Sequence, residues 1–116
     1  MDVKEEAMLA AQAASDKKAK SVTVLDMSQV SSVADFFVIC SASNPIQARA
    51  IADAVEEKLG PVTRRGHREG YDLGRWVLLD YGPLVIHIFH EVERDYYNLD
   101  RLWGDAPSLP VAFAEA

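Results

Sequence analysis

Cysteine and long apolar runs are what this sequence of 116 residues most clearly lacks. Cys40 is the single cysteine, so the chain cannot form an internal disulfide or a zinc site built from cysteines. This scarcity favours a reducing compartment. A span across a bilayer needs roughly 20 consecutive apolar residues. Because no run comes near that length, we expect no membrane partner.

Basic charge is also scarce, with 12 lysines and arginines against 18 acidic residues and a formal net charge of −6. Such a balance argues against a chain that binds nucleic acid over its whole surface. It favours a basic partner, although solubility alone explains an acidic surface equally well. Asp2, Glu5 and Glu6 stand where a secretory signal is basic and where a transit peptide avoids acids. We therefore expect a cytoplasmic protein.

Length and composition suit one globular domain. Hydrophobic residues make up 49% of the chain and charged residues 26%, which are ordinary proportions for a folded protein. We predict a single domain over residues 1–105 and an irregular tail over 106–116, where two prolines interrupt the sequence. A first helix is predicted over residues 3–18. Its apolar residues are small, which predicts weak packing.

Hydrophobic patterning predicts five strands. β-Branched residues favour a strand over 22–27, and the almost wholly apolar run 36–42 is typical of a strand buried on both faces. A short strand is expected around 62–67. The runs 76–81 and 84–89 flank a Gly-Pro pair, which indicates an antiparallel hairpin.

Two further helices complete the predicted pattern. The first begins at Pro45, with Asn44 placed to cap it and Gln47 to reach back to that cap. Gly60 ends it. A second is expected over 91–97, since acidic residues near a helix start suit its dipole. The element order predicts the α/β class, with a mixed five-stranded sheet and flanking helices.

Several segments of the sequence together match one known pattern. They are Asp35–Ile39, Ser43-Asn44 with Gln47 and Ala50, Glu69-Gly70, Trp76–Gly82, His87–Phe89 and Arg94–Trp103. No single segment is diagnostic, but by their order and spacing the chain resembles the ribosomal silencing factor family, also called the Iojap or RsfS family, over about residues 5 to 105. Pro83 departs from the resemblance, because the family usually has an acidic or polar residue at that turn.

The resemblance implies a non-enzymatic role. Members of the family bind the large ribosomal subunit through its fourteenth protein, obstruct the joining of the subunits and repress translation, notably when nutrients are scarce. Their fold is nucleotidyltransferase-like without that chemistry, and they are commonly homodimers when free. The resemblance therefore implies no cofactor, no metal and no small-molecule substrate for this chain.

Residues of the predicted hairpin supply the candidate site. Trp76, Leu78 and Asp80 share one face of their strand, because side chains alternate. Tryptophan is a frequent interface anchor, and a carboxylate accepts hydrogen bonds from a basic partner. The alternative interpretation makes Trp76 a core residue beneath a helix and Asp80 a turn residue. With the resemblance, we predict a ribosomal-protein-binding site at Glu69, Trp76, Leu78, Asp80 and Tyr81.

Metal binding and catalysis are weaker interpretations. His87 and His90 lie an odd number of positions apart on a predicted strand, so their side chains point to opposite faces. The two histidines could share a metal ion with Glu91 and Glu93 only if the strand ended before them. We therefore interpret His87 as a satisfied strand residue and His90 as a surface one. Nucleotidyl transfer needs a Gly-Ser loop and paired carboxylates for Mg²⁺. The serine run over 40–44 has no glycine, and Asp-x-Asp is absent.

Two side-chain groups leave alternatives open. The basic cluster Arg64, Arg65, His67 and Arg68 can touch ribosomal RNA, or can mark an edge strand protected from aggregation. The aromatic group Tyr96, Tyr97, Leu102 and Trp103 packs on the sheet or contacts a partner. Two other functions also remain open: a metal-dependent nucleotidyltransferase, and a module that only associates with itself.

Overall fold

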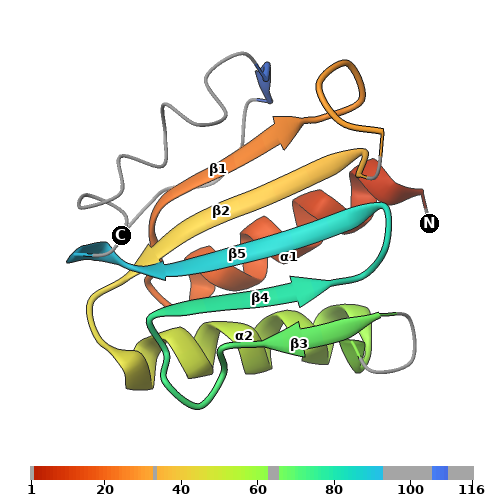
Figure 1. The fold of residues 1–116 in the computed structure, drawn as a ribbon. Helices are drawn as coiled ribbons and strands as arrows, with labels where there is room; N and C mark the ends of the chain where they lie inside the picture. Colours follow the sequence, from red (N-terminus) through yellow and green to blue (C-terminus); the bar gives the residue numbers. More distant parts are fainter. Residues whose placement is uncertain (1, 33, 63–65, 93–105, 110–116) are drawn as a thin grey trace.

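The computed structural model describes residues 2–32, 34–62, 66–92 and 106–109. These residues form a six-stranded sheet with two helices packed on one face (Figure 1). The strand order is β3-β4-β5-β2-β1-β6. The β2–β5 pair is parallel and the other neighbours are antiparallel, so the prediction of a mixed α/β sheet is confirmed. The elements are α1 (Val3–Asp16), β1 (Lys20–Asp26), β2 (Phe36–Ala42), α2 (Pro45–Leu59), β3 (His67–Glu69), β4 (Trp76–Asp80), β5 (Leu84–His90) and β6 (Ser108–Leu109).

The sixth strand corrects the prediction of five strands and a wholly irregular tail. Ser108 and Leu109 pair with Leu25 and Val24 of β1. The backbone N–H of Asp26 also donates to the carbonyl of Pro107, at 2.9 Å. A strand of two residues carries no alternation for a sequence to display, and it forms here because β1 offers an unpaired edge.

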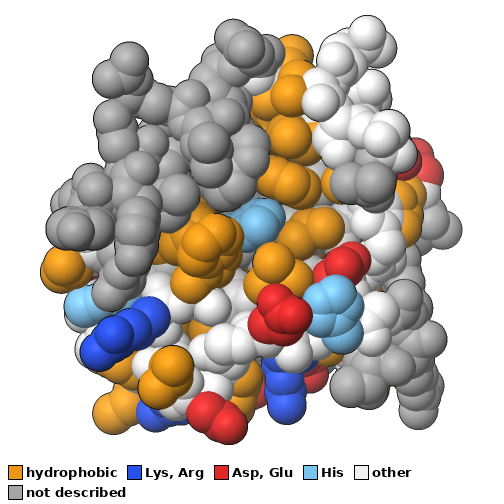
Figure 2. All heavy atoms as spheres, viewed as in Figure 1, with side chains coloured by type: hydrophobic (Ala, Val, Ile, Leu, Met, Phe, Trp, Pro, Cys, Tyr) orange, Lys and Arg blue, Asp and Glu red, His pale blue; other side chains and the backbone are white. Residues whose placement is uncertain are grey.

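The two faces of the sheet differ. Val77 and Leu79 of β4 point toward the helices and join the main core, which also includes residues of α1 and α2. The opposite face, here called the distal face, holds a smaller apolar cluster that includes Ile39 and Phe89. Figure 2 views this face: hydrophobic side chains gather over β5 and β4, with acidic and histidine side chains beside them over β3 and β4.

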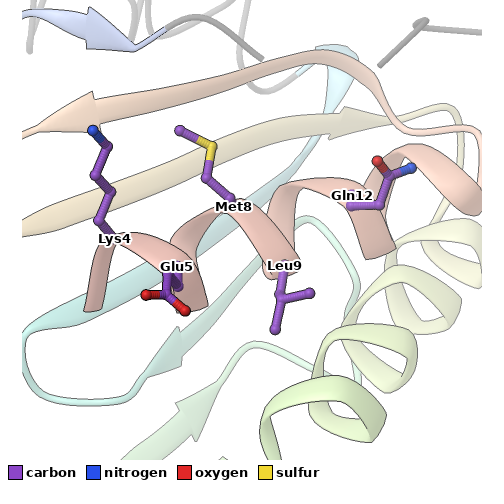
Figure 3. A pocket seen from close by; sticks show the side chains of 5 residues that line it. All are labelled: Lys4, Glu5, Met8, Leu9 and Gln12. Carbon is purple, nitrogen blue, oxygen red and sulfur yellow. The ribbon is translucent and has the colours of Figure 1, made fainter. Parts of the chain in front are cut away.

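Helix α1 packs closely, in contrast to the expected weak packing. Its five alanines from Ala7 to Ala14 are at most 2% exposed, because small side chains let the helix approach the sheet and α2. A hollow of about 520 Å³ lies along its outer side (Figure 3). The described lining comes from this helix alone, at Lys4, Glu5, Met8, Leu9 and Gln12.

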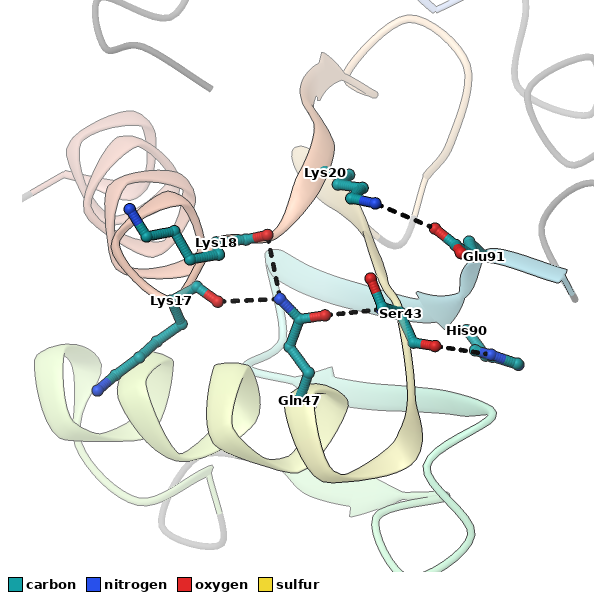
Figure 4. Close-up of polar contacts among 7 residues, drawn as sticks. All are labelled: Lys17, Lys18, Lys20, Ser43, Gln47, His90 and Glu91. Carbon is teal, nitrogen blue, oxygen red and sulfur yellow. Dashed lines mark hydrogen bonds and ion pairs between the residues drawn. The ribbon is translucent and has the colours of Figure 1, made fainter. Parts of the chain in front are cut away.

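Helix α2 begins and ends where predicted. Asn44 Oδ1 accepts the backbone N–H of Gln47 at 2.8 Å. The Gln47 side chain reaches back one residue further than expected, since its Oε1 accepts the N–H of Ser43 at 2.7 Å. Its Nε2 donates to the carbonyls of Lys17 and Lys18, both at 3.1 Å (Figure 4). Gln47 therefore joins the α1–β1 turn to the β2–α2 turn.

The predicted hairpin is confirmed, and the preceding strand is displaced. β4 and β5 pair antiparallel across a turn in which Gly82 has a φ of 90°. β3 begins at His67, where the sequence predicted a strand over 62–67, and it lies at one edge of the sheet. Among the described residues, neither helix has the length and apolar character needed to cross a membrane.

Candidate functional site

Four of the five predicted site residues lie together on the distal face. In the register of the sheet, Glu69 is opposite Leu78, and Trp76 is opposite Phe89. Since alternate residues of a strand share a face, Trp76, Leu78 and Asp80 project to the same side, and Glu69 on the neighbouring strand joins them. These four residues, Glu69, Trp76, Leu78 and Asp80, are called the Trp76 cluster below.

Tyr81 does not join the cluster. It continues the alternation of Val77 and Leu79 into the helix side, is 1% exposed, and belongs to the main core. Its hydroxyl donates to the carbonyl of Gly60 at the end of α2, at 2.8 Å. A partner that approaches the distal face has no access to this side chain, so Tyr81 is a residue of the core at the hairpin turn.

Trp76 is partly supported and partly exposed. Its indole centroid lies 4.7 Å from that of Phe89, and its Nε1–H donates to Nδ1 of His87 at 3.1 Å. Despite these contacts, 40% of the Trp76 surface is exposed to solvent. The alternative interpretation of Trp76 as core beneath a helix does not hold for the described helices, because α1 and α2 pack on the other face.

Two carboxylates share this face toward the edge of the sheet, Glu69 at the hollow beside Trp76 and Asp80 at the far end of β4. Asp80 is the last residue of β4, and its Oδ1 accepts the backbone N–H of Gly82 in the turn at 2.8 Å, which agrees in part with the alternative interpretation. Its Oδ2 lies 3.7 Å from Nδ1 of His67, whose Nε2 is 3.5 Å from Glu69 Oε1. The side chains of Asp80 and Glu69 are 31% and 67% exposed. The cluster therefore has an acidic rim.

A hollow of about 320 Å³ opens between these residues, lined by Glu69, Gly70, Trp76 and Leu78. Gly70 is required here, because its φ is 75° and a Cβ would lie 2.0 Å from the carbonyl oxygen of Trp76. The glycine lets β3 and β4 approach closely behind the hollow. Because the hollow is apolar and has a carboxylate at its rim, it suits an apolar side chain of a partner that also carries a basic residue next to it.

His87 lies beneath the cluster as a buried strand residue, and its Nδ1 accepts a hydrogen bond from Trp76, which agrees with the interpretation for that atom. It is 5% exposed, and burial lowers its pKa to about 4, although the nearby charge of Asp80 opposes this shift. The imidazole is therefore neutral near pH 7, which leaves Nδ1 able to accept. Sequence reasoning missed its link to Trp76. The hairpin register, in which Leu78 faces His87 and Trp76 faces Phe89, is the signal that places the two rings on one face.

The other predicted groups do not converge on a second site within the described residues. Nε2 of His90 is 3.2 Å from the carbonyl oxygen of Ser43 (Figure 4), whereas His87 bonds to Trp76. No group of three potential metal ligands occurs in the part of the chain that the structure describes. Glu93, and all four residues of the aromatic group from Tyr96 to Trp103, lie outside the described residues, as does all but the start of the predicted helix over 91–97.

The basic cluster is divided between the faces of β3. His67 points to the distal face, whereas Arg68 points toward α2, where its Nη1 lies 3.3 Å from Glu56 Oε1 and its guanidinium covers the ring of Tyr71 at 4.3 Å. Arg64 and Arg65 lie outside the described residues. The position of β3 at the sheet edge agrees with the edge-strand interpretation, and an RNA contact stays a prediction.

Comparisons with known proteins agree with one another. The family model described as "Ribosomal silencing factor during starvation" matches residues 1–116. The ribosomal silencing factor RsfS of Halalkalibacterium halodurans is 46% identical over 106 residues, which cover 89% of each chain. RsfS of Bacillus subtilis is 43% identical over 106 residues, covering 90% of each chain.

A solved structure shares the fold. The crystal structure of a Chromobacterium violaceum protein superposes with a TM-score of 0.81 at 32% identity, covering 100% of this chain and 97% of that one. The expected likeness to nucleotidyltransferases stays a prediction. The match of the family model to the full sequence, together with relatives above 40% identity, shows that this chain belongs to the ribosomal silencing factor (RsfS) family.

Proposed function

We propose that this chain binds the large ribosomal subunit through its fourteenth protein and prevents the small subunit from joining. The observation that carries the proposal is the Trp76 cluster, in which an indole 40% exposed shares a hollow with Glu69 and lies on the same strand face as Asp80, away from α1 and α2. Family membership supports an action on the ribosome. The chemistry of the cluster supports a basic protein as the surface that it meets.

The composition of the cluster suits protein binding. Interface cores are rich in aromatic residues and have polar rims, and a few buried anchors carry most of the binding free energy. Trp76 and Leu78 supply the apolar centre, while Glu69 and Asp80 supply the rim. The net charge of −6 accelerates the encounter with a basic partner more than it tightens the complex.

Steric occlusion needs affinity but no catalytic group. The folded chain measures 32 × 31 × 26 Å. Ribosomal subunits join through contacts at hydrogen-bond distance, about 3 Å, so a body of this size on one contact surface holds the other surface away. We propose that the role is therefore non-enzymatic. It is carried out in the cytoplasm, where the subunits meet.

Self-association is proposed as a property of the free chain. The resemblance to the family supports a homodimer, and the exposed apolar part of the Trp76 cluster is a surface that a second copy can cover. Sedimentation of the free chain over a range of concentrations measures this directly.

A subunit-joining experiment tests the proposed function. Large subunits are incubated with the chain, small subunits are added, and the mixture is separated on a sucrose gradient. We expect the chain to migrate with large subunits and the peak of joined ribosomes to fall as the chain is added. Unchanged joining of the subunits at a saturating concentration of the chain, or migration of the chain with small subunits, would contradict the proposal. A chain that stays at its own dimer position with neither subunit would favour the module that only associates with itself.

A further inference from the structure

We infer that His87 is a positioning residue for the docking surface: its buried imidazole accepts the indole N–H of Trp76 and fixes the orientation in which the partner meets that ring. This inference rests on the proposed function of the Trp76 cluster. It concerns a residue that lies beneath the contact surface and is 5% exposed. His87 therefore acts on the partner through Trp76.

The imidazole is held in place by aromatic rings. The ring of Phe37 meets it edge-on, with centroids 4.6 Å apart. The ring of Phe89 lies nearly parallel to it, at 6.0 Å and 5°. An imidazole packed between these rings and the strand beneath cannot turn freely, so the lone pair of Nδ1 has a fixed direction.

The indole is consequently held at two points. Its ring lies against Phe89, with centroids 4.7 Å apart, and its Nε1–H reaches His87 Nδ1 at 3.1 Å. A tilted ring contact alone leaves the indole able to slide or flip, whereas a hydrogen bond at one edge selects a single orientation. The exposed 40% of Trp76 is therefore presented in a defined pose.

The residue type at position 87 agrees with this role. Its neighbours at alternate positions on the distal face of β5 are Val85 and Phe89, and an apolar side chain would fill the same space. Burying an imidazole among apolar groups is unfavourable unless it is hydrogen-bonded. The indole N–H supplies such a bond, and a neutral ring keeps Nδ1 available as the acceptor.

Fixing the anchor before binding strengthens the complex. A side chain that must be ordered during association lowers the affinity, and a pre-organised one does not. Because tryptophan has few rotatable bonds, one hydrogen bond is enough to select its pose. The gain expected from His87 is accordingly modest, about 3- to 10-fold in affinity, which corresponds to the net value of one hydrogen bond.

Two substitutions separate positioning from packing. His87→Phe keeps a flat ring of similar size and removes the acceptor. His87→Asn leaves space in the core but keeps an acceptor, since Oδ1 of asparagine is bonded to Cγ as Nδ1 of histidine is. We expect His87→Phe to bind large subunits about 3- to 10-fold more weakly than the natural chain. We expect His87→Asn to bind more tightly than His87→Phe despite a less stable fold.

A spectroscopic signature accompanies the binding measurement. The indole N–H resonance of Trp76, assigned by its loss in Trp76→Phe, reports the hydrogen bond directly by NMR. It should move upfield in His87→Phe and stay near its original position in His87→Asn. Both readings are taken on the free protein, so they do not depend on the ribosome.

The outcomes distinguish this inference from the proposed function. If His87→Phe loses the hydrogen-bonded signal but binds large subunits like the natural chain, His87 does not position the anchor, and the docking proposal stands. If affinity falls in step with stability, so that His87→Asn binds worst, the residue is structural and the inference is wrong. If the natural chain itself does not bind large subunits, the proposed function fails, and this inference fails with it.

Discussion

Trp76→Ala is expected to weaken binding to the large subunit at least about 30-fold, which corresponds to roughly 2 kcal/mol. The substitution removes the largest apolar group of the cluster and empties one wall of the hollow that Leu78 and Gly70 also line. Affinity is measured by titrating labelled chain against purified large subunits. The fold should survive, because Trp76 is 40% exposed and its loss opens no enclosed cavity beneath the helices.

The matched control is Ile46→Ala on α2. Ile46 is 74% exposed, so this variant also removes a large exposed apolar side chain, but from the helix side of the molecule. It should bind like the natural chain. Equal losses of affinity in both variants would show that the effect is not specific to the distal face. Undiminished binding by Trp76→Ala would show that Trp76 is not an anchor of the interface.

Substitutions of Asp80 test whether the acidic rim of the Trp76 cluster contributes to binding. Asp80→Arg places a positive charge against a basic partner and should weaken binding strongly. Asp80→Asn keeps an oxygen to accept the N–H of Gly82 and removes only the charge, so it should bind with intermediate affinity. Glu57→Arg makes the same charge change on the exposed side of α2 and should have little effect.

Acid is expected to destabilise the fold through His87, by up to about 3 kcal/mol. The pKa of His87 is lowered from 6.5 to about 4 by burial. Between these values the unfolded chain binds a proton at His87 and the folded chain does not, so the free energy of unfolding falls as the pH falls. The loss begins near pH 6.5 and is complete near pH 4, below which both states are protonated.

Urea unfolding followed by circular dichroism at several pH values between 7.5 and 4 measures this dependence. His87→Phe is the control, because it lacks the titrating group while the carboxylates still titrate. The difference in stability between the two proteins should shift in favour of His87→Phe as the pH falls through this range. A constant difference would mean that His87 has an ordinary pKa in the folded chain, which contradicts the burial of its ring.

Local patterns in the sequence were sufficient for the hairpin β4–β5, but not for β3, which carries Glu69 and was predicted over residues 62–67. Alternation placed Trp76, Leu78 and Asp80 on one face of a strand, and the structure keeps them there. The same alternation places Tyr81 with the core, where it is 1% exposed. Tyr81 was included in the predicted site with the resemblance to the family, and strand geometry was the better guide.

Features that depend on distant contacts could not be predicted in this way. β6 exists because the edge of β1, more than 80 residues earlier in the chain, accepts it. Which face of the sheet the helices leave uncovered depends on how α1 and α2 pack, and no single strand contains that information. The hydrogen bond between Trp76 and His87 also requires both side-chain orientations, which the hairpin register alone does not give.

Site-specific cross-linking shows whether the Trp76 cluster contacts a protein of the large subunit. A photoreactive benzophenone residue is placed at Leu78, inside the hollow, and in a second protein at Glu57 on α2. Irradiation with large subunits should link position 78 to the fourteenth protein, identified by mass spectrometry, and leave position 57 unlinked. A link to that protein from position 57 alone, or from position 78 only to a second copy of the chain, would contradict the account.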